Sequence, residues 1–420
     1  MEIMLNKILY RKLFGIFDYE INLKKEGVTI ITGPNGFGKS TILKSINAFY
    51  TFDIMFFGEL DFEKIDFYSD NFDAPVCIEK RNQKVIVDGF EINLESLEKE
   101  IIKNIKRPYF IKLDEGKWID RRTDEIITKE ELIKTILINN NILEDAGKLD
   151  TIQITEIRDK FKEYSGETKF IKEQRLLREE RIGRFENKTI SVIEEIPSKF
   201  IRKMNMVSSK YSSEANKLDS SYPNRLFKTN KGITEGEYAN SIKLMNERFE
   251  KLNKYNISDI RRLEEQDIFQ KEHAKALKIY FDDFEKKYKV FEDFIDQLDL
   301  FTDIINSRLK FKEIKISREK GIVVYKSGTD DQLKLNHLSS GEKQEIILFY
   351  ELVFESDKNI HLLIDEPEIS LHIEWQLKFM DDLLKIADKK RFKVTVATHS
   401  PQIINNHWDI QIDLGELYGN

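Results

Sequence analysis

The chain carries Gly33-Pro34-Asn35-Gly36-Phe37-Gly38-Lys39-Ser40 near its N-terminus, with Thr41 directly after it. This stretch fits G-x-x-x-x-G-K-[ST], the pattern of a phosphate-binding loop. The β-branched run at residues 28–31 predicts a buried strand before the loop, and residues 41–49 predict a helix after it. A glycine-rich turn between a strand and a helix directs several backbone N–H groups and the helix dipole at one anion.

The side chains of this stretch fit the same chemistry. We expect Lys39 to reach the β- and γ-phosphates of a nucleotide and Ser40 to hold Mg²⁺. The alternative is an incidental glycine turn, which the flanking strand and helix pattern disfavours. Gly33–Ser40 is called the phosphate loop below.

Composition limits the class of protein. The 420 residues carry a net charge of -7, which argues against wholesale binding to nucleic acid or to an anionic membrane, although a local basic groove is compatible with it. The single cysteine, Cys77, excludes an internal disulfide framework and suits a reducing compartment. The N-terminus lacks a signal-peptide pattern and the apolar runs are short. We therefore expect a cytoplasmic protein without membrane spans.

Strand and helix patterns occur at both ends of the chain. Residues 1–50 predict an antiparallel strand pair before the phosphate loop, and the aromatic residues of 51–75 predict core packing or, as the alternative, a base-stacking surface. Asp88-Gly89 predicts a hairpin, and the capping box at residues 128–131 predicts a helix that runs to Ile138. Strand and helix alternation returns from residue 311 onwards.

The middle of the chain has a different pattern. Residues 169–177 predict a strand, and residues 185–307 predict mostly helix, interrupted by Pro197 and by a turn at residues 220–223. The apolar heptads are few and broken, which favours a compact helical lobe over a long coiled coil. We therefore predict one α/β domain split by an insertion: residues 1–180, a helical lobe at 181–307, and residues 308–420.

Three further segments carry residues that suit nucleotide chemistry. An apolar strand at residues 360–364 ends in Asp365 and Glu366, which suit Mg²⁺ binding and activation of a water; an acidic turn is the alternative. Residues 338–344, Leu-Ser-Ser-Gly-Glu-Lys-Gln, suit a second phosphate site at a helix N-terminus or a simple capping box. His399 ends the last strand, where it suits a γ-phosphate contact or a place in the core.

The order and spacing of these segments resemble the ATP-binding-cassette (ABC) ATPase superfamily. The resemblance implies a Walker A motif at the phosphate loop, a signature motif at Leu338–Glu342, a Walker B motif at Asp365 with Glu366 as catalytic residue, and a switch histidine at His399. It implies ATP and Mg²⁺ as cofactors and catalytic roles for Glu366, His399 and Lys39. Its implied ATP contacts are Gly33, Pro34, Asn35, Gly36, Phe37, Gly38, Lys39, Ser40, Thr41, Gln174, Ser339, Ser340, Gly341 and Glu342, with Ser40, Asp365 and Gln174 at the metal.

The resemblance also implies the fold: an ABC-type P-loop head with a mixed sheet flanked by helices, an antiparallel β subdomain and a large, mainly helical insertion between Walker A and signature. Within the superfamily, the large insertion is similar to the SMC, Rad50 and RecF branch. The stretches Asp-Glu-Pro-Glu, Ser-Leu-His and Thr-His-Ser-Pro resemble OLD-like ATPases. Residues 170–177 and 218–226 resemble the ATPase subunit (PtuA-like) of Septu-type anti-phage systems.

Two departures bear on partners. Ser340 stands where the superfamily signature usually has glycine. The chain ends about 20 residues beyond His399, so a C-terminal nuclease domain of the OLD type is not expected. If nucleic acid is cut, a separate nuclease subunit, of HNH type in Septu-like systems, is the expected agent.

The resemblance implies a homodimer or higher homo-oligomer, in which ATP lies between the phosphate loop of one chain and Ser339–Gly341 of the other. The arginines at 175, 178, 181 and 184 recur every three residues, which predicts a solvated face or, if helical, a DNA-backbone contact. The leading hypothesis is an ATPase that regulates a nuclease partner. The alternatives are a repair ATPase that binds DNA directly, a transporter ATPase subunit, and a nucleotide-dependent scaffold with negligible turnover.

Overall fold

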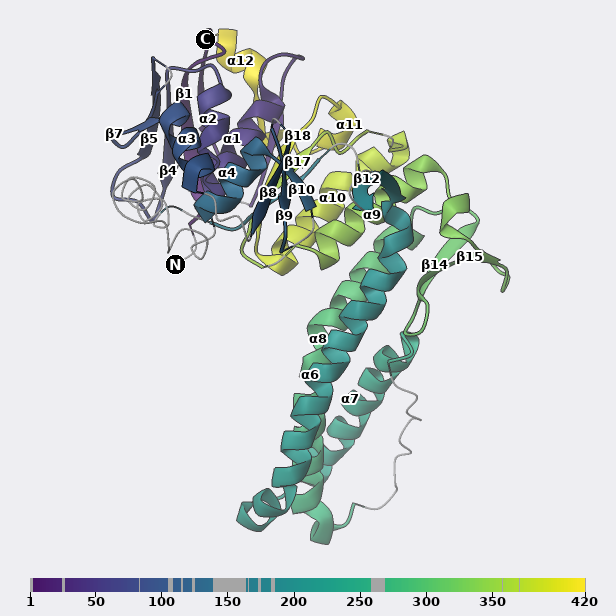
Figure 1. The fold of residues 1–420 in the computed structure, drawn as a ribbon. Coiled ribbons are helices and arrows are strands. Elements are labelled where there is room, and N and C mark those ends of the chain that lie inside the picture. The colour runs from purple at the N-terminus through teal and green to yellow at the C-terminus, as the bar shows by residue number, and fades with distance from the viewer. Residues whose placement is uncertain are drawn as a thin grey trace. The chain divides into compact units, whose positions relative to one another are not determined.

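The computed structural model describes most of the chain as two units (Figure 1). The described residues are 3–24, 27–82, 84–104, 109–114, 116–122, 125–138, 164, 166–172, 175–182, 186–257, 269–356, 358–369 and 371–419. The first unit consists of Met1–Arg175, Glu179–Thr189 and Ser356–Asn420, and the second of Leu176–Arg178 and Ile190–Glu355. Each unit is described by itself.

A five-stranded parallel sheet forms the centre of the first unit. Its strand order is β11 (Thr168–Ile171), β17 (His361–Asp365), β18 (Lys393–Ala397), β3 (Val28–Thr32) and β19 (Gln411–Asp413). Both β3 and β17 are buried along their whole length, as expected for strands of a covered parallel sheet. Because β3 pairs with β18, the two ends of the chain share one sheet, which confirms an α/β domain interrupted by an insertion.

Helices accompany this sheet. They are α1 (Lys39–Thr51), α10 (Ile373–Lys390), α11 (Pro401–Ile404) and α12 (Leu414–Gly419), with a 3₁₀ turn η4 at Trp408–Ile410. The apolar face predicted for α1 is buried, because Ile42, Leu43, Ile46 and Phe49 are each at most 1% exposed. The phosphate loop therefore lies between a buried strand and a buried helix, as the sequence predicts.

A six-stranded antiparallel sheet forms a second layer of this unit. Its order is β2 (Phe17–Asn22), β1 (Leu5–Leu13), β4 (Lys64–Ser69), β5 (Val76–Arg81), β6 (Lys84–Val87) and β7 (Phe90–Asn93). Asp88 and Gly89 both have positive φ in the turn between β6 and β7, which confirms the predicted hairpin. Phe57 and Phe67 are buried in the core that α2 (Ile54–Glu59) and this sheet share, which supports core packing over a base-stacking surface.

A smaller part of the first unit contains β8 (Phe110–Asp114), β9 (Lys117–Asp120) and β10 (Glu125–Thr128), with α3 (Leu94–Asn104) and α4 (Lys129–Ile138). The capping box at the start of α4 is present, because Thr128 and Glu131 each accept the other's backbone N–H. This confirms the predicted start of the helix, which is described as far as Ile138. The mixed α/β fold with an antiparallel subdomain thus agrees with the predicted fold class.

Three long helices dominate the second unit: α6 (Val192–Lys228), α7 (Glu235–Lys254) and α8 (Ala274–Asn306), with a 3₁₀ turn η2 at Lys271–His273. α6 and α8 lie side by side in Figure 1, and their contacts show an antiparallel pair. The Phe200 and Phe301 rings meet at one end, Tyr211 and Phe291 further along, and Arg225 and Asp283 near the other end. The prediction of a compact helical lobe was wrong, since a 37-residue helix spans about 55 Å.

The predicted interruption at residues 220–223 was also wrong. α6 continues through Pro197 and Pro223. A proline inside a helix costs about 3 kcal/mol in isolation, because it removes one hydrogen bond and crowds a carbonyl. Near Pro223 the Arg225 guanidinium donates to the Leu218 carbonyl at 2.7 Å and binds Asp283 of α8. Packing against α8 therefore outweighs the local preference for a turn.

The second unit also contains β14 (Lys312–Ser317), β15 (Gly321–Lys326), β16 (Gln332–Leu333), the 3₁₀ turn η3 (Leu335–His337) and α9 (Ser340–Phe354). The predicted domain division assigns residues 308–355 to the C-terminal part of the head, whereas by packing they group with the long helices. The functional division at residues 180 and 307 stays a prediction.

The segment before α6 differs from expectation. The strand predicted at 169–177 ends at Ile171, and a separate strand, β12 (Leu177–Ile182), follows it. The region expected to be helical from residue 185 onwards contains β13 (Glu186–Ser191) before its first helix. A helical basic stripe through Arg178 and Arg181 is therefore wrong, because this backbone is extended. Arg184 lies outside the described residues.

His361 connects the parallel sheet to the antiparallel layer. Its Nε2 lies 2.8 Å from the Thr395 hydroxyl on β18, and its Nδ1 lies 3.3 Å from the Tyr50 hydroxyl on α1. The Tyr50 hydroxyl accepts the backbone N–H of Leu5 at 2.9 Å, which leaves its own proton for Nδ1. Complete burial lowers the pKa of His361 to about 3, so the ring is neutral.

Candidate functional site

The phosphate loop joins β3 to α1 through three glycines with positive φ: Gly33 at 143°, Gly36 at 86° and Gly38 at 91°. These conformations are open to glycine and strained for other residues. A Cβ at Gly38 would also lie 3.1 Å from the Phe14 ring. The buried Lys39 side chain folds back over the loop, and its Nζ donates to the Gly33 carbonyl at 3.0 Å. The loop therefore combines an open backbone cradle with a cation.

The remaining predicted loop residues surround this cradle. Pro34 and Asn35 are exposed, whereas Thr41 is half-buried in the first turn of α1. The Phe37 ring packs against Phe17 at 5.2 Å and against Tyr418 of α12 at 5.9 Å between ring centroids. Aromatic packing thus holds the outer side of the loop.

Ser40 and Asp365 meet although 325 residues separate them. The Ser40 hydroxyl donates to Oδ1 of Asp365 at 2.9 Å. Asp365 is buried at the carboxyl end of β17, and β17 and β3 flank β18 in the sheet. A hydroxyl and a carboxylate oxygen this close, beside a phosphate cradle, fit the hard oxygen ligands that Mg²⁺ prefers.

Glu366 follows Asp365 in a constrained backbone. Its φ is 44°, and its backbone N–H donates to the Ala397 carbonyl at 2.9 Å. Its carboxylate Oε2 lies 2.6 Å from Nδ1 of His399, which follows β18. Burial, and then the neighbouring Glu368 carboxylate, raise the pKa of Glu366 to about 7. A carboxylate with this pKa suits proton transfer near neutral pH.

Glu368 is a site residue whose role the sequence patterns do not predict. Its side chain is 5% exposed, and Oε1 accepts the Thr398 hydroxyl at 2.6 Å and the His399 backbone N–H at 3.0 Å. It therefore fixes the end of β18 that carries His399. One ligand atom from each of Glu366, Glu368 and His399 lies within 4.8 Å of the others. The available signal is the acid two residues after Glu366, beyond Pro367.

Arg175 also approaches the site. Its guanidinium is buried, and Nη2 donates to the Asp365 carbonyl at 3.4 Å. This placement contradicts a solvated face for Arg175. Gln174, predicted to contact ATP and the metal, lies outside the described residues.

Phe14 is a second residue that motif reasoning does not identify. It lies in the turn between β1 and β2, its ring is 37% exposed, and it borders Gly38 as described above. Its neighbour Phe17 meets it edge to face at 6.4 Å. An exposed aromatic ring at the phosphate loop suits contact with a flat ring of the nucleotide.

The signature segment lies in the second unit, so it is described apart from the phosphate loop. Ser339 caps α9 and forms a reciprocal capping box with Glu342. Burial alone would raise the pKa of Glu342, but hydrogen bonds from Lys312 and Ser339 lower it. Lys312 Nζ lies 2.8 Å from the Glu342 carboxylate. The Glu342 side chain is therefore held by hydrogen bonds within the second unit. Ser339 and Ser340 are exposed beside Gly341 at the helix N-terminus.

The parallel sheet, the glycine loop at its carboxyl edge and the Ser40–Asp365 pair define a P-loop fold of the nucleotide-binding class. The family model described as "AAA ATPase domain" matches residues 12–404. The chain belongs to this AAA ATPase domain family.

More distant similarities were also found. A probable branched-chain amino acid transport ATP-binding protein, LivF, of Archaeoglobus fulgidus is 51% identical over 37 residues. This match covers 9% of the chain and 16% of that relative. Two solved Smc head structures, one from Pyrococcus furiosus bound to a domain of ScpA and one bound to a winged-helix domain of ScpA, are 13% identical. Their TM-scores are 0.36 and 0.38, and both matches cover 96% of this chain and 92% of the other.

No helix among the described residues is long and apolar enough to cross a membrane.

Proposed function

We propose that this chain is an ATP-hydrolysing head that uses ATP to join two copies of itself and thereby regulates a partner effector. One observation carries the ATPase part of the proposal. Ser40, Asp365, Glu366 and His399 come from three segments far apart in sequence and meet at one edge of the parallel sheet. A purely structural role for these carboxylates would not explain the glycine-rich phosphate loop beside them.

The residues present fit MgATP. The three positive-φ glycines turn the backbone toward one point, Lys39 supplies a cation, and Ser40 with Asp365 supplies hard oxygen ligands. When bound there, Mg²⁺ supplies neutralising charge for the phosphates. Gln174 remains a proposed ligand from the family pattern.

Glu366 is the proposed base for the attacking water. Its pKa of about 7 leaves the carboxylate partly ionised at neutral pH, so it accepts a proton readily and releases it again. The Nδ1 atom of His399 contacts the Glu366 carboxylate. The second ring nitrogen, Nε2, is therefore directed away from Glu366, which suits a contact with the γ-phosphate. Glu368 fixes the position of His399 by accepting its backbone N–H.

The site is proposed to be completed by a second copy. Ser339, Ser340 and Gly341 form an exposed helix N-terminus, which is an anion-binding arrangement. In ABC-type heads the equivalent segment contacts the ATP held by the other chain. The homodimer rests on this resemblance and on the exposure of the segment, with Ser340 in place of the usual glycine.

We propose a regulatory role downstream of ATP hydrolysis. The resemblance to SMC, RecF, OLD and Septu-type ATPases favours an effector, such as an HNH-type nuclease, in anti-phage defence or DNA processing. The alternative is a repair ATPase that binds DNA directly. A transporter role has the short LivF match in its favour, but the long helices of the second unit do not resemble a transporter subunit. The neighbouring genes and a DNA-binding assay with and without ATP separate these roles.

Glu366→Gln tests the ATPase assignment. We expect turnover to fall by about 10²–10⁴-fold, because the amide cannot accept the proton, while ATP binding is retained. Light scattering should show an ATP-dependent dimer that accumulates. Glu59→Gln, an exposed glutamate at the end of α2, is the matched control. Hydrolysis at the wild-type rate by Glu366→Gln would show that the catalytic assignment is wrong.

Ser340→Arg tests the dimer separately. A bulky cation on this exposed residue should leave ATP binding intact and abolish both the dimer and hydrolysis. Ser327→Arg, also exposed in the second unit, is the control. A dimer of normal affinity with Ser340→Arg contradicts the proposed interface without affecting the assignment of the phosphate loop.

A further inference from the structure

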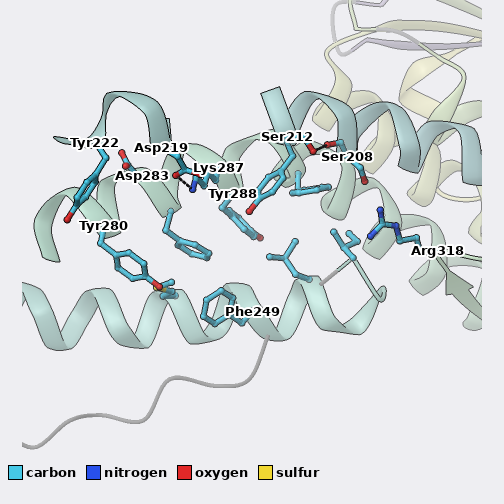
Figure 2. Close-up of a pocket in the computed structure, with 16 residues that line it drawn as sticks. Ser208, Ser212, Asp219, Tyr222, Phe249, Tyr280, Asp283, Lys287, Tyr288 and Arg318 are labelled. Atoms are coloured by element: carbon cyan, nitrogen blue, oxygen red, sulfur yellow. Dashed lines mark hydrogen bonds and ion pairs between the residues drawn. The ribbon is translucent and has the colours of Figure 1, made fainter. Parts of the chain in front are cut away.

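A cavity of about 550 Å³ lies within the second unit, among α6, α7, α8 and the β14–β15 turn (Figure 2). Pockets for small molecules usually measure a few hundred to a thousand Å³. The cavity belongs wholly to the second unit and contains none of the nucleotide-site residues. The proposed function does not use it.

Aromatic residues are the most frequent type in its lining, seven of sixteen. Figure 2 shows Tyr280, Tyr288 and Phe249 directed into the space between the helices. Phe249 of α7 meets Phe284 of α8 edge to face at 5.0 Å, and Tyr211 of α6 meets Phe291 of α8 at 5.0 Å. Rings on three helices therefore border one space. Such walls favour a flat, apolar body with faces for stacking.

The charged side chains that line the cavity differ in whether a described residue of opposite charge pairs with them. Asp219 is paired with Lys287 at 2.8 Å, and Asp283 is held by both terminal nitrogens of Arg225. Both carboxylates in the lining are thus neutralised by cations. Arg318 reaches the cavity from the β14–β15 turn, and no ion pair joins it to another residue in the described part of the chain. The uncompensated charge at the cavity is therefore positive.

We propose that this cavity binds a small planar aromatic anion, with its ring between the tyrosine and phenylalanine side chains and its anionic group at Arg318. Aromatic faces and a guanidinium at one end match a ligand that is flat and apolar at one end and negatively charged at the other. Tyr280, which is 47% exposed, lies at the end of the cavity opposite Arg318 in Figure 2. A peptide helix, the alternative occupant, would bind in the same cavity through an apolar face and would not need an anionic group.

The probe for the test is anilinonaphthalene sulfonate, a fluorescent planar aromatic anion, added to the full-length protein. We expect saturation at about one probe per chain, in the presence of saturating MgATP as well as in its absence. The neutral analogue phenylnaphthylamine, which lacks the sulfonate, should bind at least about tenfold more weakly. Equal binding of the neutral analogue would overturn the anionic part of the proposal.

Variants locate the probe. Arg318→Glu should weaken its binding at least about tenfold, whereas Arg202→Glu, an exposed arginine of α6 outside the lining, should not. Tyr280→Ala should weaken binding, whereas Phe227→Ala, 86% exposed at the end of α6, should not. Circular dichroism melts establish that each variant is folded. Unchanged binding in both Arg318→Glu and Tyr280→Ala, or displacement of the probe only by an apolar helical peptide, would refute the proposed ligand class.

Discussion

The phosphate-loop region and the signature region are stabilised in different ways. In the first, hydrogen bonds join residues distant in sequence: Ser40 to Asp365 across 325 residues and Glu366 to His399 across 33. In the second, Ser339 and Glu342 bond within one helical turn, and Lys312 is 30 residues away. The first region therefore depends on the assembled sheet, and the second depends on one helix and its neighbour. Substitutions should separate the two.

The largest effect is expected at Lys39. Lys39→Ala removes the buried cation above the cradle, and ATP affinity should fall by about a thousandfold or more, which is about 4 kcal/mol. Hydrogen exchange in α9 should stay unchanged, because the signature region does not depend on Lys39. Lys44→Ala, exposed on the same helix, serves as the control. Calorimetric titration with ATP measures both, and near-normal affinity of Lys39→Ala would contradict the cradle.

A buried ion pair provides the corresponding test in the second unit. Arg308 Nε lies 2.7 Å from Oε1 of Glu345 on α9, and the two side chains are 1% and 3% exposed. Arg308→Met removes the guanidinium beside this buried carboxylate and should destabilise this unit by about 3–4 kcal/mol in urea unfolding. The double variant Arg308→Met/Glu345→Met should recover much of the loss. If the double variant is as unstable as the single one, packing rather than charge explains the effect.

An intermediate effect is expected at Glu368. The ATPase rate should rise with pH through about 7, because Glu366 acts as a base only when deprotonated. Glu368→Gln removes the neighbouring negative charge, so the pKa of Glu366 should fall and the midpoint should move about one unit lower. The KM for ATP should be nearly unchanged, since Glu368 does not touch the loop. A midpoint unchanged from wild type would show that burial alone sets the pKa.

The smallest effect is expected at the cap of α9. Ser339→Ala removes the side-chain acceptor for the Glu342 N–H and should cost about 1 kcal/mol, a Tm decrease of about 2–4 °C. The neighbouring Ser340→Ala should change Tm by much less. If the monomeric Ser339→Ala variant bound ATP more weakly than the wild-type monomer, the two regions would not be independent.

Much of the first region was predictable from sequence because its rules are local. Glycines at 33, 36 and 38, the β-branched residues of β3 and the capping box at Thr128 each specify a backbone conformation. The site residues from Gly33 to Ser40 and at 365, 366 and 399 follow from motif order, although their roles stay predictions. Glu368 was missed because its bonds to Thr398 and His399 exist only after β17 and β18 pair.

The second unit was predicted less well for the same physical reason. Pro197 and Pro223 carry a strong local signal against helix, and contacts with α8 over the length of α6 outweigh it. Outside the second unit for most of their length, the β-strands at 177–182 and 186–191 likewise form by pairing with each other, which a run of charged residues does not reveal. Tertiary contacts decided these segments, and sequence periodicity does not report such contacts.

His361 gives the first unit a sensitivity to acid. Its pKa of about 3 in the folded chain lies below its ordinary value of 6.5, so the unfolded chain takes up a proton first as the pH falls. Folding stability should therefore be complete above pH 6.5 and decline below it, by up to about 1.4 kcal/mol per pH unit until about pH 3. Protonation in the folded chain would also cost the hydrogen bond that the Tyr50 hydroxyl donates to Nδ1, one of several contacts between the parallel sheet and the antiparallel layer. Acidification below pH 6.5 therefore destabilises the nucleotide-binding unit through a residue of its core, and protonation of His361 in the folded chain needs a pH near 3.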